Sequence, residues 1–128
     1  MPAPVILLAE DEHVTRRAIQ GALVDMGFIV HAAANGDEGC VLIDQMKDDC
    51  PQLLITDVDM PGCCGEDLAE YARQHCSQIK VLFTSGKSRS ALVKSITGDP
   101  NTNFLEKPFS PTDLSAAIQA LGVGQRGA

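Results

Sequence analysis

Short apolar runs alternate with amphipathic segments along the chain. The runs predict five strands, at 5–9, 28–30, 53–56, 81–84 and 104–105. Such continuous runs are typical of parallel strands that are buried on both faces of a sheet. Helical spacing of apolar residues predicts five helices, from His13 to Met26, from Asn35 to Met46, from Glu66 to Cys76, after Gly86, and from Ser110 to Leu121.

Each predicted helix has an apolar face, and several have recognisable ends. The expected faces are Val14, Ala18, Ala22, Leu23 and Met26; Val41, Leu42 and Met46; Leu68, Tyr71, Ala72 and Cys76; Leu92, Val93 and Ile96; and Leu114, Ile118 and Leu121. Asn35 and Ser110 are predicted N-caps, and Pro111 takes the first position of its helix. Gly27 and Gly122 are predicted to end two of the helices.

The alternation predicts an α/β fold, a doubly wound five-stranded parallel sheet with helices on both faces. Its crossovers should be right-handed. We expect one domain over 1–128, with a core of about 4–122 and a flexible tail at 123–128. In such sheets ligands bind outside the carboxyl ends of the strands, which makes the residues that follow each strand the candidate site.

Composition narrows the setting of this domain. No apolar run approaches the roughly 18 residues of a membrane span, and the N-terminus shows no signal peptide, so we expect a cytoplasmic protein without a membrane partner. The net charge of −7 disfavours direct nucleic-acid binding, which needs a basic surface.

The cysteines suggest reduced thiols rather than a scaffold. There are five, at 40, 50, 63, 64 and 76, and no two of them form a CxxC pair. A zinc site or a set of disulfides is therefore not expected. Cys63 and Cys64 lie in a predicted loop near the candidate site, and redox sensing there stays an open alternative.

Polar groups follow four of the predicted strands. They are Glu10 and Asp11, Asp57, Ser85, and Lys107. Taken singly, such residues are most often solvated caps, turns or surface charges. Together they would place three carboxylates at one edge of the sheet, where like charges repel. A divalent cation removes that repulsion, and the oxygen ligands suit Mg²⁺.

These residues sit in motifs that resemble the response regulator receiver family over about residues 4–122. The matching pieces are Glu10-Asp11, Asp57 with Met60-Pro61 and Gly65, Ser85-Gly86, and Lys107-Pro108-Phe109. The resemblance implies a flavodoxin-like or CheY-like (βα)5 fold with strand order 2-1-3-4-5. It also implies a signalling module that catalyses only its own phosphorylation and dephosphorylation.

The resemblance implies a role for each residue. Asp57 would accept a phosphoryl group from a histidine kinase or phosphotransfer protein. Mg²⁺ would be held by Asp11, Asp57 and the carbonyl of Asp59, with Glu10 acting partly through water. Lys107 and Ser85 would bind the phosphoryl oxygens, and Phe104 would rotate inward. That rotation would change the surface of the fourth helix, fifth strand and fifth helix, where a downstream protein binds. The Lys107-Pro108 bond resembles the cis peptide of the family.

Some positions depart from the family pattern. Glu10 replaces the commoner Asp, and Phe104 lacks the hydroxyl of the commoner Tyr. Thr84 remains an alternative to Ser85 as the switch hydroxyl. Asp59 and Lys87 either tune the approach of anions or form a surface ion pair. The polar segment 97–103 replaces the usual small residues and leaves the shape of the output face open.

Two other functions compete with this interpretation. Asp57-Val58-Asp59 resembles the DxD motif of haloacid-dehalogenase-like phosphatases, although there the motif belongs on the first strand. A pseudo-receiver that binds without taking phosphate is the second alternative. The chain could act alone, as a monomer or weak dimer, or belong to a hybrid histidine kinase.

Overall fold

The computed structural model describes residues 3–46, 48–60, 63–86 and 99–123 of the chain. Within them the elements are β1 (Val5–Ala9), α1 (His13–Asp25), β2 (Ile29–Ala33), α2 (Gly36–Met46), β3 (Leu53–Asp57), α3 (Gly65–His75), β4 (Lys80–Ser85), β5 (Thr102–Glu106) and α5 (Pro111–Ala120). The helix predicted after Gly86, with Leu92, Val93 and Ile96, lies outside the described residues. The other four helices and all five strands are confirmed.

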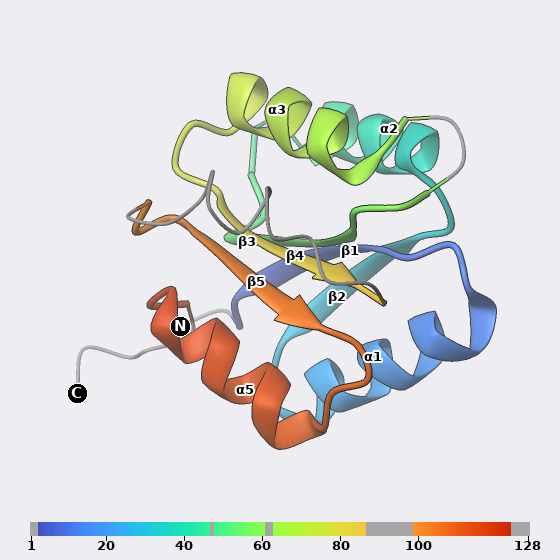
Figure 1. The fold of residues 1–128 in the computed structure, drawn as a ribbon. Coiled ribbons are helices and arrows are strands. Elements are labelled where there is room, and N and C mark those ends of the chain that lie inside the picture. The colour runs from blue at the N-terminus through green and yellow to red at the C-terminus, as the bar shows by residue number, and fades with distance from the viewer. Residues whose placement is uncertain (1–2, 47, 61–62, 87–98, 124–128) are drawn as a thin grey trace.

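The five strands form one parallel sheet in the order β2-β1-β3-β4-β5. Helices α2 and α3 cover one face, and α1 and α5 cover the other (Figure 1). Because side chains alternate along a strand, Leu7 and Leu54 face the α2–α3 side while Ile6 and Ile55 face the α1–α5 side. The predicted fold class and strand order are therefore confirmed.

Three of the helices begin with a side-chain cap. Asn35 accepts a hydrogen bond from the Glu38 backbone N–H at 2.8 Å, and Ser110 with Asp113 forms a reciprocal capping box before Pro111. Both predicted caps are thus confirmed. Glu12 caps α1 by accepting from the Thr15 backbone N–H at 3.2 Å, which places its first turn directly after the acidic pair.

The buried faces of α1 and α2 differ from those predicted. Val14 is 73% exposed and Val41 is 54% exposed, so the expected faces were partly wrong. In α1 the buried residues are Ile19 and Leu23, which lie four apart on one side of the helix. Apolar residues outside that stripe simply face water, as many surface residues do.

Glycines make up much of the buried face of α2. A Cβ on Gly36 would lie 1.9 Å from the Cys63 carbonyl oxygen, and one on Gly39 would lie 2.8 Å from Leu68 Cδ2. The helix therefore packs through its backbone against the loop before α3 and against α3 itself. A pattern of apolar side chains cannot reveal a face that is built from residues without side chains.

The C-terminal boundary of the core lies beyond the predicted one. Val123, expected to begin the flexible tail, is only 5% exposed and belongs to the core on the α1–α5 side. Gly122 ends α5 with a φ of 79°, a left-handed conformation that is easy only for glycine. The turn at Gly122 directs Val123 back against the sheet, so this part of the prediction was wrong.

One disulfide contradicts the expectation of five reduced thiols. Cys50 and Cys76 are joined, with Cα atoms 5.8 Å apart and a sequence separation of 26 residues. Cys50 precedes β3, and Cys76 is the C-cap of α3. The bond therefore closes a loop that contains β3 and α3. No sequence motif announces this pair, because its members meet only when α3 has folded back along β3.

The disulfide predicts a redox-dependent stability. Cys50→Ser should lower the free energy of unfolding of the oxidised protein by about 3 kcal/mol, because the unfolded chain regains the freedom of the loop. Urea unfolding followed by circular dichroism measures this difference. In the presence of a reductant the variant and the parent should unfold at nearly the same urea concentration. Equal stability without reductant would contradict a stabilising role for the bond.

Candidate functional site

The carboxyl ends of β1 and β3 bring three acidic side chains together. Ligand oxygens of Glu10, Asp11 and Asp57 all lie within 4.8 Å of one another. Glu10 is 1% exposed and Asp57 is 7% exposed, whereas Asp11 faces solvent. Among the described residues, this is the one group of three or more carboxylate, imidazole or thiol ligands that could hold a metal ion.

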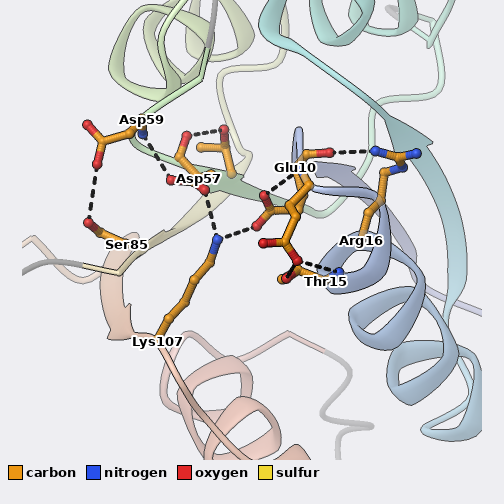
Figure 2. Close-up of polar contacts among 9 residues, drawn as sticks. Glu10, Thr15, Arg16, Asp57, Asp59, Ser85 and Lys107 are labelled. Atoms are coloured by element: carbon orange, nitrogen blue, oxygen red, sulfur yellow. Dashed lines mark hydrogen bonds and ion pairs between the residues drawn. The ribbon is translucent and has the colours of Figure 1, made fainter.

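Lys107 bridges the two buried carboxylates from the end of β5. Its Nζ atom lies 2.5 Å from Glu10 Oε1 and 2.8 Å from Asp57 Oδ2 (Figure 2). Burial lowers the pKa of Lys107, but the hydrogen bonds to Asp57 and Glu10 outweigh burial and raise it. Burial raises the pKa of Glu10, and the hydrogen bond from Lys107 offsets this only in part. One ammonium thus compensates two carboxylates.

Asp57 is held on both of its carboxylate oxygens. Oδ2 accepts from Lys107, and Oδ1 accepts from the backbone N–H of Asp59 at 2.9 Å. The backbone behind it is equally confined, since a Cβ on Gly65 would lie 2.1 Å from the Asp57 carbonyl oxygen. The side chain therefore has a defined direction before any ligand binds, and this direction is toward the other two carboxylates.

The Asp59 side chain contacts Ser85 and is not part of the acidic cluster. Its exposed side chain turns toward Ser85, whose Oγ lies 3.5 Å from Asp59 Oδ2 (Figure 2). Its backbone N–H donates to Asp57 Oδ1 at 2.9 Å. The structure thus places the Asp59 side chain at the rim of the site, beside Ser85.

The remaining predicted residues lie around this rim. Ser85 and Thr84 are both buried at the end of β4, and Thr84 is the register partner of Asp57. Phe104 is half-buried and packs against the core on the α2–α3 side. The Lys107–Pro108 peptide is cis, as expected. Lys87 lies outside the described residues.

Arg16 belongs to the site, although the sequence did not single it out. Its Nη1 atom donates to the carbonyl oxygen of Glu10 at 3.0 Å (Figure 2). An arginine on a mostly exposed helix is usually a solvated charge. Its place one turn into α1 was the available signal, because the first turn of that helix must lie beside the end of β1.

The Cys63 thiol is poorly suited to redox sensing. Burial raises the pKa of the Cys63 thiol to about 11 and also raises the pKa of Cys40. Reactive cysteines have lowered pKa values, because the thiolate is the reactive form. The structure therefore disfavours the hypothesis that Cys63 is a sensor.

The described helices include none that is long and apolar enough to span a membrane.

Fold and site together define a flavodoxin-like α/β protein with a lysine-bridged acidic cluster at the carboxyl edge of its sheet. The family model of the response regulator receiver domain matches residues 6–119. The chain belongs to the response regulator receiver family, whose members act in two-component signalling.

Relatives of two kinds match almost the whole chain. The sensor kinase CckA of Brucella abortus (strain 2308) is 31% identical over 116 residues, which cover 91% of this chain but 12% of that protein. The response regulator receiver protein CpdR of the same organism is also 31% identical over 116 residues, covering 91% of this chain and 94% of that protein. This chain therefore spans a small part of CckA and nearly all of CpdR.

Solved structures agree with the fold. A response regulator receiver protein from Sinorhizobium medicae WSM419 superimposes with a TM-score of 0.80 at 28% identity, covering 96% of this chain and 98% of that one.

Lys107 should be the main electrostatic support of the metal-free site. Lys107→Met should lower the free energy of unfolding at pH 7 by about 3 kcal/mol, because it leaves buried carboxylates without their partner. Since the pKa of Lys107 is raised, the contribution of its ammonium is complete at pH 7. It is lost only as the pH rises through the folded pKa, above the ordinary 10.5. Urea unfolding in a chelator at several pH values measures both effects.

The loss of unfolding free energy in Lys107→Met should become smaller as the pH falls toward 4.5, the ordinary pKa of a glutamate such as Glu10. Without Lys107 the pKa of Glu10 rises further, so the folded protein takes up a proton that the unfolded chain does not bind. Lys80→Met is the matched control, because Lys80 contacts the exposed Asn101. It should change stability by less than about 0.5 kcal/mol. An equal loss in both variants would contradict the special role of Lys107.

Proposed function

We propose that Asp57 accepts a phosphoryl group from the phosphohistidine of a histidine kinase or phosphotransfer protein, and that Mg²⁺ is required. The observation that carries this proposal is the convergence of Asp57 with Lys107, Glu10 and Asp11. A carboxylate aimed into a cluster of cation ligands, with an ammonium in contact, suits the transfer of an anionic group. Apart from this self-modification, we expect no enzymatic activity.

The transfer needs little from the protein beyond position and charge. A carboxylate oxygen of Asp57 forms a bond to phosphorus, while the phosphorus–nitrogen bond of the donor breaks and its electron pair returns to the imidazole. Asp57 is already held by Asp59 and Lys107, so little ordering remains at the moment of reaction. The Lys107 ammonium is placed to contact the oxygens of the arriving group and to stabilise their charge.

The donor set fits Mg²⁺. Three carboxylates with oxygens within 4.8 Å of one another form a small all-oxygen cluster, which is the ligand chemistry that Mg²⁺ prefers. Asp11 and Asp57 would bind directly, the Asp59 carbonyl would add a third oxygen, and Glu10 would act partly through water. When bound, the cation supplies positive charge that stabilises the transferring phosphoryl group. Its charge also relieves the repulsion among the carboxylates.

The partners follow from the family. Receiver domains interact with histidine kinases or phosphotransfer proteins and with downstream effectors. We propose that this chain works in the cytoplasm on a protein partner rather than on nucleic acid. Two settings are compatible with the sequence similarities. The chain acts as a separate regulator, as CpdR does, or as a domain of a kinase, as in CckA.

The two alternative functions, a phosphatase and a pseudo-receiver, are no longer equally supported. Family membership and strand order leave the haloacid-dehalogenase-like phosphatase without support. A pseudo-receiver remains an outcome of the labelling experiment below, because it would keep the fold and fail to take the phosphoryl group.

Phosphorylation of Asp57 is the direct test. With Mg²⁺ and a small phosphodonor such as acetyl phosphate, the protein should gain one acid-stable, base-labile phosphoryl group. Asp57→Asn should abolish the labelling, because the amide is not a nucleophile at this position. Intact-protein mass spectrometry counts the added groups. Full and persistent labelling of Asp57→Asn would overturn the assignment.

Two controls separate the acceptor from its surroundings. Asp25→Asn changes an exposed carboxylate at the far end of α1 and should label like the parent. Asp11→Ala keeps the acceptor but loses a proposed metal ligand, so its labelling at moderate Mg²⁺ should fail. Normal Mg²⁺ binding by Asp11→Ala would transfer the ligand role to other groups, Glu10 first.

We further propose that the phosphoryl group is read by Ser85 and Phe104. The Ser85 hydroxyl lies at the rim next to Asp59, and a small movement toward Asp57 would let it donate to a phosphoryl oxygen. Phe104 is half-buried, so its ring has area left to bury. Taking an exposed side chain of this kind to full burial is worth roughly 1.5–3 kcal/mol, and the half-buried Phe104 gains only part of this. That is less than the ~5.5 kcal/mol that a complete population reversal needs. The domain should therefore be a partial switch.

Amide NMR spectra with and without beryllofluoride, a mimic of the phosphoryl group, test this switch. Large shifts should cluster within 84–109, because Ser85 and Phe104 lie there. Ser85→Ala should remove the shifts around Phe104, whereas Thr84→Val, its buried neighbour, should retain them. The reverse result would make Thr84 the switch hydroxyl. Shifts confined to Glu10, Asp11 and Asp57 would mean that the site binds the mimic without signalling through this face.

A further inference from the structure

Glu10 is hydrogen-bonded through every polar group that it has. Its backbone N–H donates to the Ala33 carbonyl at 3.1 Å, and its carbonyl accepts from Arg16 at 3.0 Å. Its two carboxylate oxygens accept from Lys107 and from the Glu12 backbone N–H. With 1% exposure the residue has almost no access to water. The protein itself therefore decides how Glu10 is oriented.

The bond from Arg16 differs from the other three in what it controls. Glu10 follows the last residue of β1, so the strand no longer dictates the direction of the chain. Its carbonyl belongs to the peptide group that joins Glu10 to Asp11. Because a peptide group is planar, holding its oxygen also fixes the N–H and the Cα of Asp11.

We propose that Arg16 is a positioning residue for the acidic cluster, which holds the Glu10–Asp11 peptide so that both carboxylates point toward Asp57. This inference rests on the proposed metal-dependent function, and it assigns to Arg16 a task that no metal ligand performs. Groups that orient the ligands of a metal typically change its affinity by 10- to 100-fold when they are removed.

The guanidinium is well suited to this task. While Nη1 binds the Glu10 carbonyl, Nη2 lies 3.0 Å from Nδ1 of His13. Arginine has only donors, so His13 must accept through this nitrogen. The two contacts fix the plane of the guanidinium. A lysine at this position could make one of these hydrogen bonds but lacks the planar fork that makes both.

Magnesium titration of the metal-free protein tests the proposal. By isothermal titration calorimetry, Arg16→Ala should weaken Mg²⁺ binding about tenfold or more. Arg16→Lys should fall between this variant and the parent. Arg17→Ala is the matched control, because Arg17 is the next residue on α1, is exposed, and has the same charge. Arg17→Ala should bind Mg²⁺ within about twofold of the parent, because salt screens the effect of an exposed charge. Both variants lose one positive charge, so the difference between them reports the contact of Arg16 with Glu10. Equal weakening in Arg16→Ala and Arg17→Ala would overturn the proposal.

A merely structural role of Arg16 is separated by two further measurements. Urea unfolding first shows that each variant is folded in the absence of urea. The Mg²⁺ titrations are then done without urea, so that only folded molecules contribute. Phosphorylation of Arg16→Ala by acetyl phosphate should recover at high Mg²⁺ concentration, because the variant is impaired in metal affinity alone. A defect that persists at saturating Mg²⁺ would overturn the proposal. Should Arg16→Ala fail to fold, Arg16→Lys carries both tests.

A metal-free readout keeps this inference separate from the proposed function. In amide NMR spectra recorded with a chelator, Arg16→Ala should shift Glu10, Asp11 and Asp57. Changes confined to 13–20, on its own helix, would overturn the positioning role even if Mg²⁺ binds. If the parent protein binds no Mg²⁺ at all, the proposed function fails, while these spectra still decide whether Arg16 orients the cluster.

Discussion

Crowding of carboxylates at one edge of the sheet is the constraint on which the site depends. The strand order places β1 beside β3, so the residues at the carboxyl ends of these two strands lie close together. Two of these residues, Glu10 and Asp57, are buried. Their charges are tolerated because a single ammonium from β5 reaches both. These two ion pairs join the carboxyl ends of three strands, β1, β3 and β5, in one electrostatic unit.

Close backbone packing supports this unit from behind. Gly36 on α2 touches the backbone of Cys63, and Gly65 touches the backbone of Asp57. Side chains at either glycine would have to displace main-chain atoms, which cannot move without moving β3 or α2. Cys63 is therefore packed tightly against α2, and Gly65 against the end of β3. This confinement explains how the end of β3 can present the Asp57 carboxylate in one direction.

Most of the fold was predictable because its signals are local. Continuous apolar runs marked the strands, and the polar groups after them marked the site, since parallel strands end at a common edge. What could not be predicted depends on contacts between distant segments. The glycine face of α2 has no apolar pattern, the Cys50–Cys76 pair forms only after α3 folds back, and Arg16 gains its role from the neighbouring Glu10 carbonyl. Val123 likewise owes its burial to the turn at Gly122.

The disulfide turns part of this chain into a covalent ring. Residues 50–76 are closed on themselves, and Asp57 lies inside the ring. A protease that cuts once within the ring converts it to a linear segment but leaves the two pieces of the protein joined as one molecule. Their separation on a gel then requires a thiol reagent. Force applied to the two ends of the chain likewise bypasses β3 and α3, because the sulfur–sulfur bond transmits the tension from residue 50 directly to residue 76.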